Sequence, residues 1–267
     1  LTAEGKILFI IDGDSDELCD ITGETAVIIT DRTPFYGEGG GQVGDSGVIT
    51  GQNGYAIVTD TKKTDGVYMH VCKIESGSLS VGDRVTLTVD ASRRAAVARN
   101  HSAVHLLDAA LRDVLGTHIR QAGSYVDDKE ARFDFTHFAA VTPEELARVE
   151  MLVNEKILDG IPVSTLETDV ESAKKSGAIA LFGEKYGNIV RVVKMGDFSA
   201  ELCGGTHVDN TAKIGLFKIT MESSVAAGTR RITAVSGFGS YQRMIQEETL
   251  ISSAMKTLKA GTSADVL

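Results

Sequence analysis

The chain has 267 residues, of which 42% are hydrophobic and 24% charged, a composition typical of a globular protein large enough to bury a sizeable core. No apolar run approaches the roughly 18 residues that cross a bilayer, so a membrane protein is excluded. Three cysteines, at 19, 72 and 203, are too few for a disulfide framework, and the first residues lack a signal-peptide pattern. The cytoplasm is therefore the expected location.

The net charge of −10 argues against a general affinity for nucleic acid, because binding to phosphates needs clustered Lys and Arg. Two arrangements would reconcile this charge with a nucleic-acid partner. The basic residues could gather on one face, or a neighbouring domain could supply the affinity.

Short β-branched runs separated by Gly, Asp and Asn occupy the first third of the chain. Between residue 6 and about residue 90 they read KILFII, AVIIT, GVIT, YAIVTD, VYMHV and RVTLTV. Short strands at this spacing are typical of a small barrel or sandwich. We therefore expect a β-barrel-like first domain over residues 1–90.

The hydrophobic period changes at Asp90 from that of strands to that of a helix. Asp90 is suited to an N-cap, apolar residues then recur at helical intervals, and Gly116 is suited to end the helix. A second helix is predicted by Thr142-Pro143-Glu144-Glu145, which has capping-box spacing with proline at the first helical position, and should run to about Asp159.

Strand-like segments surround these two helices. IRQAGSYV and ARFDFT predict a hairpin with its turn at 127–129, and further strands are expected at IPVSTLE, NIVRVVKM, GLFKITM and RRITAVS. From about Tyr241 to the end the chain is expected to form one helix. The predicted fold class is thus α+β: a barrel-like domain over 1–90, a mixed α/β domain with an antiparallel sheet over 91–240, and a helical tail over 241–267.

Two short motifs contain residue types that bind metal ions. In His101-Ser-Ala-Val-His105 the two imidazoles share one face of the predicted helix, and in Cys203-Gly-Gly-Thr-His207 two glycines let a thiol and an imidazole converge from a loop. One thiolate and three imidazoles suit tetrahedral zinc. However, His pairs at helical spacing are common on ordinary helices, and a lone Cys is usually a buried small hydrophobe. The two patterns by themselves leave both interpretations open.

HSAVHLL together with CGGTHV resembles the paired zinc motif of alanyl-tRNA synthetase editing domains and of the freestanding AlaX-type editing proteins. Three other stretches resemble that family in the same order: TPFYGEGGGQVGDSG at 33–47, GAIALFGEKYG at 177–187 and AAGTRRITAVSG at 226–237. The resemblance spans nearly the whole chain. It implies that 91–240 is an editing domain and that Zn²⁺ is bound by four residues, namely His101, His105, Cys203 and His207.

The resemblance also implies roles for residues outside the metal motifs. The glycine-rich loop would wall the editing pocket with Gly39, Gly40, Gly41 and Gln42, although many relatives have serine where this chain has Gly39. Thr33 would contact the aminoacyl group, and Gln121 would hydrogen-bond the substrate. Arg230 or Arg231 would reach tRNA phosphate or the terminal adenosine, because an Arg fork matches phosphate geometry. The alternatives are a tight turn for the glycines and exposed strand positions for Gln121 and one of the two arginines.

The activity implied by the resemblance is hydrolysis of serine or glycine from mischarged tRNA(Ala). A site that charges alanine cannot easily reject these two amino acids, so a second site removes the errors. No aminoacylation motif occurs, so the partners would be the tRNA(Ala) acceptor end and the remaining domains of the synthetase. Four protein ligands would close a tetrahedral site. The ion would therefore either anchor the substrate after one ligand, with Cys203 as the candidate, has loosened, or have a structural role only. HSAVH also lacks the Glu of the metalloprotease motif HExxH.

Two other functions remain open from the sequence. One is a non-catalytic module in which zinc joins two halves of a tRNA-binding domain, and an assay of ester hydrolysis separates it from an enzyme. The other is a freestanding trans-editing protein. That possibility depends on whether the reading frame extends beyond Leu1 or Leu267, and the helical tail favours an internal fragment.

Overall fold

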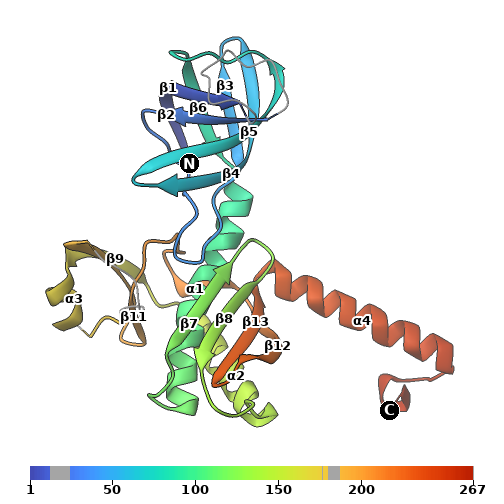
Figure 1. Cartoon of the computed structure of the whole chain (residues 1–267). Helices are drawn as coiled ribbons and strands as arrows, with labels where there is room; N and C mark the ends of the chain where they lie inside the picture. Colours follow the sequence, from blue (N-terminus) through green and yellow to red (C-terminus); the bar gives the residue numbers. More distant parts are fainter. Residues whose placement is uncertain (13–24, 176, 180–186, 267) are drawn as a thin grey trace.

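The computed structural model describes residues 1–12, 25–175, 177–179 and 187–266. Figure 1 shows a barrel at one end of the molecule and a long helix, α1, that leads from it into a second region of sheets and helices. This arrangement confirms the predicted α+β class with a small barrel at its N-terminal end.

Six antiparallel strands form the closed barrel, in the order β1-β2-β5-β4-β3-β6. Alternate side chains such as Ile10, Ile28, Ile49 and Leu87 point inward and form its core. The strands are β1 (Thr2–Asp12), β2 (Ala26–Thr30), β3 (Gly47–Gly51), β4 (Gly54–Thr64), β5 (Val67–Gly77) and β6 (Arg84–Val89). All six predicted runs are strands, and β1 begins four residues earlier than its apolar run, where Gly5 and its neighbours pair with β6.

The first two predicted helices begin where the caps in the sequence predict. The Asp90 side chain accepts hydrogen bonds from the backbone N–H groups of Ser92 and Arg93, which starts α1 (Ala91–Leu115). Thr142 and Glu145 form the reciprocal capping box of α2 (Pro143–Leu158). Both helices pack against the second core, which buries α1 along most of its length after Val97.

A four-stranded antiparallel sheet, in the order β12-β13-β8-β7, covers the other side of this core. Its strands are β7 (Gln121–Val126), β8 (Ala131–Thr136), β12 (Phe217–Ala226) and β13 (Thr229–Ser236). The β7–β8 hairpin and the strands at GLFKITM and RRITAVS confirm the sequence predictions.

A smaller antiparallel sheet lies beside α1, in the order β11-β10-β9. It contains β9 (Val163–Asp169), β10 (Ile189–Met195) and β11 (Ser199–Leu202), with α3 (Val170–Lys175) and the 3₁₀ turn η1 (Thr211–Ile214) nearby in the chain. The sequence predicted β9 and β10 but not β11 or α3. Both are too short for a hydrophobic period to be read from them.

The prediction of one helix from Tyr241 to the end was wrong in its extent. Helix α4 (Phe238–Leu258) begins three residues earlier and stops at Lys259, whose backbone is left-handed with φ 54°. The N–H of Ala260 turns back to the carbonyl of Met255, and a short 3₁₀ turn, η2 (Ser263–Val266), follows. Figure 1 shows α4 extending away from the sheet, so few neighbours stabilise its distal end.

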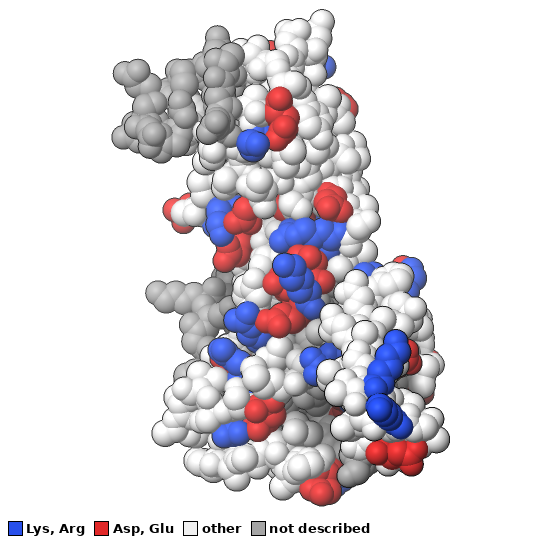
Figure 2. All heavy atoms as spheres, turned by 90° about the vertical axis from the view of Figure 1, so that its right-hand side faces the viewer, with Lys and Arg blue, Asp and Glu red and all other residues white. Residues whose placement is uncertain are grey.

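The charged side chains on the face shown in Figure 2 are mixed in sign, with Lys and Arg lying beside Asp and Glu. This face therefore carries no segregated basic surface. None of the helices in the described part of the chain is long and apolar enough to span a membrane.

Candidate metal centre

Two separate segments of the second region converge on one point. The ligand atoms of His101, His105, Cys203 and His207 all lie within 4.8 Å of one another. Cys203 Sγ is 3.4 Å from His101 Nε2 and 3.3 Å from His207 Nε2. Ring centroids of the three imidazoles are separated by 4.4 to 5.4 Å. The structure thus brings together all four predicted ligand residues, in a cluster of the size that one metal ion requires.

Local geometry explains how each segment reaches the cluster. His101 and His105 are one helical turn apart on α1 and are both buried. Residues 203–207 form the loop after β11, and Arg191 on β10 holds this loop by donating to the carbonyls of Cys203 and Gly205, at 3.0 and 2.6 Å. At Gly205 a Cβ atom would lie 2.1 Å from His101 Cε1, so only glycine lets the loop approach the helix this closely.

His101 and His207 each have a hydrogen-bond partner for the ring nitrogen that faces away from the cluster. His101 Nδ1 donates to Gln42 Oε1 at 2.7 Å, and His207 Nδ1 is hydrogen-bonded to Ser102 Oγ at 3.0 Å. His105 Nδ1 has no hydrogen-bond partner within the described residues, and Glu201 Oε2 lies 3.5 Å from it. Such outer partners fix the tautomer and orient a ring so that Nε2 faces a metal ion.

The electrostatic environment keeps the three imidazoles neutral, which is the form that binds metal ions. Burial, with a contribution from the Arg191 guanidinium, lowers the pKa of His101 to about 4. Burial also holds the pKa values of His105 and His207 well below the ordinary value of histidine. Burial and the nearby Asp108 carboxylate raise the pKa of Glu201, so this group beside His105 readily retains a proton.

Gln42 links the glycine-rich loop of the barrel region to both metal motifs. Its side chain is fully buried, and Oε1 accepts from His101 Nδ1, from the Thr206 backbone N–H at 2.8 Å and from Thr206 Oγ1 at 3.2 Å. The loop backbone docks on β7, where Val126 N donates to Gly41 O at 2.8 Å. Gln42 therefore contacts His101 and the loop at 203–207, and it is not among the residues that line the cavity, where the sequence led us to expect it.

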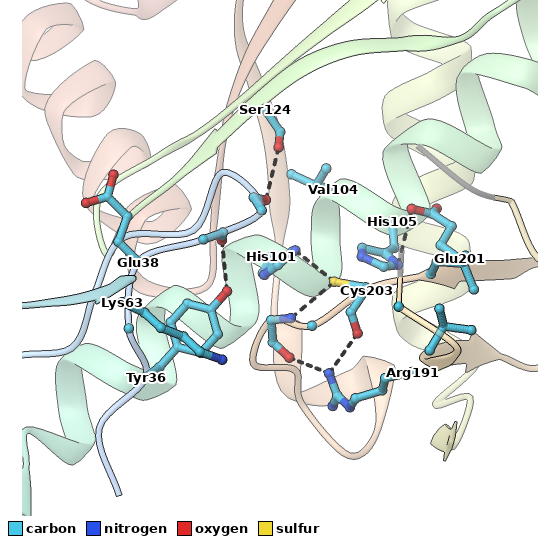
Figure 3. Close-up of a pocket in the computed structure, with 18 of the residues that line it drawn as sticks. Tyr36, Glu38, Lys63, His101, Val104, His105, Ser124, Arg191, Glu201 and Cys203 are labelled. Carbon is cyan, nitrogen blue, oxygen red and sulfur yellow. Dashed lines mark hydrogen bonds and ion pairs between the residues drawn. The ribbon is translucent and has the colours of Figure 1, made fainter. Parts of the chain in front are cut away.

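A cavity of about 440 Å³ opens beside the cluster, within the range of small-molecule sites. Figure 3 shows His101, His105 and Cys203 between the glycine-rich loop with Tyr36 on one side and Arg191 with Glu201 on the other. Gln121 lines this cavity, as do Gly39 and Gly40. These three predicted residues therefore lie next to the cluster.

Two other predicted residues lie elsewhere. Thr33 is absent from the lining of this cavity, because its hydroxyl is hydrogen-bonded to His70 Nε2 at 2.8 Å at the barrel. Arg230 on β13 is bound by the Glu222 carboxylate at 2.5 and 2.7 Å and also does not line the cavity. The contact of Thr33 with the aminoacyl group and that of Arg230 with tRNA at this cavity are therefore not supported. Gly41 faces Ser124 instead of the cavity.

Sequence reasoning missed three residues that shape the site, namely Ser102, Arg191 and Glu201. Ser102 stands inside the HSAVH motif, so its position next to His101 was a usable signal. Arg191 and Glu201 are unremarkable strand residues whose roles depend on the pairing of β10 with β11. Of the motif at 177–187, residues 180–186 lie outside the described part of the chain, and Gly187 lines the cavity.

Comparisons with known proteins agree with this architecture. Residues 1–93 match the family model of class II (A) tRNA synthetases, and residues 190–233 match the second additional domain of threonyl and alanyl tRNA synthetases. The chain is therefore homologous to class II aminoacyl-tRNA synthetases in these segments.

Relatives of known name indicate which synthetase of this class the chain resembles. The chain is 50% identical to the alanine–tRNA ligase of Acetivibrio thermocellus over 99% of its own length, and 54% identical to that of Geobacillus thermodenitrificans over 90%. The match to the alanine–tRNA ligase of Pelotomaculum thermopropionicum is 50% over 98% of the chain. The chain spans between 27% and 30% of the length of these relatives. The resemblance to alanyl-tRNA synthetases is thus confirmed for nearly all of this sequence.

Proposed function

We propose that this chain is the editing part of an alanyl-tRNA synthetase, a hydrolase that removes serine or glycine from mischarged tRNA(Ala). The observation that carries the proposal is the convergence of four ligand atoms within 4.8 Å of one another beside a cavity. The homology to alanine–tRNA ligases supports the tRNA substrate. In the relatives the matched segment accompanies a much longer chain, so the remaining synthetase domains are the proposed partners and the cytoplasm is the proposed location.

Zn²⁺ is the ion we assign to His101, His105, Cys203 and His207. Three neutral imidazoles and one thiolate are the donor set that tetrahedral zinc prefers. The buried positions of His101 and His105 on α1, and the hydrogen bonds of Gln42 to His101 and of Ser102 to His207, support a dedicated site. When bound, zinc supplies a positive charge and Lewis-acid character next to the substrate.

The residues of this chain hold the ester and limit access to it. Gln121 lines the cavity and has an amide that can hydrogen-bond the aminoacyl group. Cys203 belongs to both the cluster and the cavity lining, as do His101 and His105, so a substrate in the cavity can reach it if it is the ligand that loosens. Gly39 and Gly40 add backbone rather than side chains to the wall, which leaves room for the ester. The division into 1–90, 91–240 and 241–267 is retained as part of this proposal.

A non-catalytic zinc module is the second candidate, and a specific observation favours it. Four protein donors already surround one point, and a complete set of four closes a tetrahedral site. In that case zinc would join α1 to the loop at 203–207 without taking part in chemistry.

The decisive experiment follows the deacylation of Ser-tRNA(Ala) by the purified chain while metal content is measured. We expect zinc in a 1:1 ratio and hydrolysis well above the spontaneous rate. His101→Ala should lose both zinc and hydrolysis. The effects of Cys203→Ala on zinc content and on hydrolysis together show whether Cys203 faces the substrate or serves structure only. A zinc-loaded chain that leaves the ester intact would establish the binding module, and wild-type protein that binds no metal would contradict both candidates.

A further inference from the structure

The charged residues that line the cavity differ in whether they are already engaged. Glu38 pairs with Lys62, which also contacts Asp60 at 2.8 Å, and Glu201 lies against His105. Arg191 is occupied by two backbone carbonyls. Lys63 has no carboxylate partner within the described residues, and its ammonium lies 4.9 Å from the centre of the Tyr68 ring. It therefore brings an uncompensated positive charge to the cavity.

The solvent exposure of the lining side chains differs between the inner end of the cavity and its mouth. His101 and His105 are buried, whereas Lys63 is exposed and Tyr68 is half-buried. Figure 3 shows Lys63 beside Tyr36, on the side of the cavity away from His105 and Glu201. The open end thus has a cation and an aromatic ring, and the closed end has the metal ligands.

The β4–β5 hairpin of the barrel holds this pair against the glycine-rich loop. Lys63 is in β4 and Tyr68 is in β5, and the two residues are paired across the hairpin. A Cβ atom at Gly37 would lie 2.6 Å from Lys63 Cβ and 3.2 Å from Tyr68 Cδ1, so glycine at this position permits the close packing. Glu38 N also donates to Thr61 O at 2.8 Å, which joins the loop to β4.

From this arrangement we propose that Lys63 and Tyr68 form the subsite for the terminal nucleotides of a single-stranded RNA 3′ end. The Lys63 ammonium now lies over one face of the Tyr68 ring. When it pairs with a phosphate instead, the ring is free to stack a base without requiring a duplex. The subsite rests on the proposed function, which supplies the aminoacyl ester at the end of the RNA. The ester lies towards the metal ligands, and the nucleotide that carries it lies at the mouth on the barrel.

The test measures binding of a fluorescein-labelled RNA minihelix ending in single-stranded ACCA, uncharged, by anisotropy at several KCl concentrations. A second minihelix lacks the terminal CCA. We expect Tyr68→Ala to weaken binding of the first RNA roughly tenfold. Lys63→Ala should weaken it and lower the slope of log affinity against log salt by about 0.7. Neither variant should change binding of the shortened RNA.

Matched variants test whether a loss of affinity comes from the missing ring or charge rather than from a general change in the hairpin. Lys73→Ala removes an exposed lysine of the same hairpin that pairs with Glu75 and does not line the cavity, so it should bind both RNAs as wild type does. Tyr68→Phe and Lys63→Arg keep the ring and the charge and should restore most of the affinity.

The inference and the proposed function can fail separately. If wild type deacylates Ser-tRNA(Ala) but Lys63→Ala and Tyr68→Ala bind and hydrolyse unchanged, the subsite is refuted and the function stands. If the variants lose only the CCA-dependent affinity while no ester is cleaved, the subsite stands and the hydrolase does not. A wild-type chain that does not distinguish the two RNAs overturns the subsite.

Discussion

A single buried amide connects residues that are far apart in the sequence. Gln42 Oε1 accepts from an α1 histidine and from the loop of the second metal motif. Its Nε2 has no hydrogen-bond partner within the described residues. The hydrogen bonds to Oε1 are therefore the ones that stabilise this buried side chain. The bond from His101 Nδ1 to Oε1 in turn fixes the orientation of the His101 ring.

Replacing Gln42 should therefore weaken metal binding even though Gln42 is not a ligand. We expect Gln42→Ala to lower zinc affinity about 10- to 100-fold, because His101 loses the partner that fixes its tautomer. Competition with a chromophoric chelator measures the change. Gln121→Ala is the matched control, since Gln121 lines the cavity but contacts none of the four ligands through a hydrogen bond in the described structure. Equal affinities of the two variants would refute the positioning role.

The buried side chain of His70 makes the stability of the barrel depend on pH. Its side chain is fully buried between the Ile28 carbonyl and the Thr33 hydroxyl, at 2.8 Å from each. Burial lowers the pKa of His70 below its ordinary value. Between the folded and unfolded pKa values the unfolded state binds more protons, so folding stability rises with pH there.

The free energy of unfolding should consequently fall as pH drops below about 6.5, the unfolded pKa of histidine. His70→Asn removes this titration. At pH 8 we expect the variant to be less stable by about 1–3 kcal/mol, from the lost buried hydrogen bonding. Its loss of stability on acidification should be smaller than that of wild type in urea titrations at several pH values. Parallel pH profiles for the two proteins would contradict this account.

At the scale of elements, the position of the loop at 203–207 depends on a close approach of its backbone to α1. Gly205 faces the His101 ring at a distance that excludes any Cβ atom, whereas a Cβ atom at the neighbouring Gly204 would meet no atom within 4 Å. The two glycines therefore differ in function although the motif presents them as equivalent.

Alanine at each position separates these roles. Gly205→Ala should displace the loop from His101 and abolish stoichiometric zinc binding. Gly204→Ala should bind zinc as wild type does. Metal content after gel filtration checks both proteins, and far-ultraviolet circular dichroism checks that each is folded. Retention of zinc by Gly205→Ala would mean that the loop and α1 are not packed as described.

At the scale of the whole molecule, polar contacts fix the glycine-rich loop of the barrel region against the start of α1. Asp45 in the segment after β2 is buried and forms an ion pair with Arg94 of α1, with Arg94 Nε at 2.8 and 2.9 Å from the two carboxylate oxygens. Arg93 donates to the Gly44 carbonyl at 2.7 Å. The glycine-rich loop is thereby anchored at the start of α1, and Gln42 reaches His101 on the same helix.

Removal of the metal should therefore destabilise the fold beyond the site itself. A ligand that binds only the folded state adds about 4 kcal/mol at a free concentration a thousand times its Kd. For a chain of this size that corresponds to a loss of roughly 10 °C in Tm after chelation. Differential scanning calorimetry with and without chelator measures it, and His101→Ala should show no chelator effect. An unchanged Tm of wild type would argue against a bound ion.

Much of the fold could be predicted from the sequence because its signals are local. The strand runs, the Asp90 cap and the Thr142 capping box each depend on neighbours a few residues away. The short strand β11 could not be predicted, since its four residues become a strand only by pairing with β10 and by the bridge of Glu201 to Ile179. The end of α4 was missed for a related reason, because Lys259 must adopt a left-handed conformation that no simple pattern predicts.

The sequence by itself determined the four candidate ligand residues and their spacing. Two histidines one helical turn apart, and a Cys and a His separated by Gly-Gly-Thr, are local features. Only the tertiary structure decided that these pairs share one centre, that Gln42 orients His101, and that Thr33 and Arg230 are engaged elsewhere. The physical reason is that such contacts depend on the register of strands and the docking of loops, which join residues up to 164 positions apart in the chain.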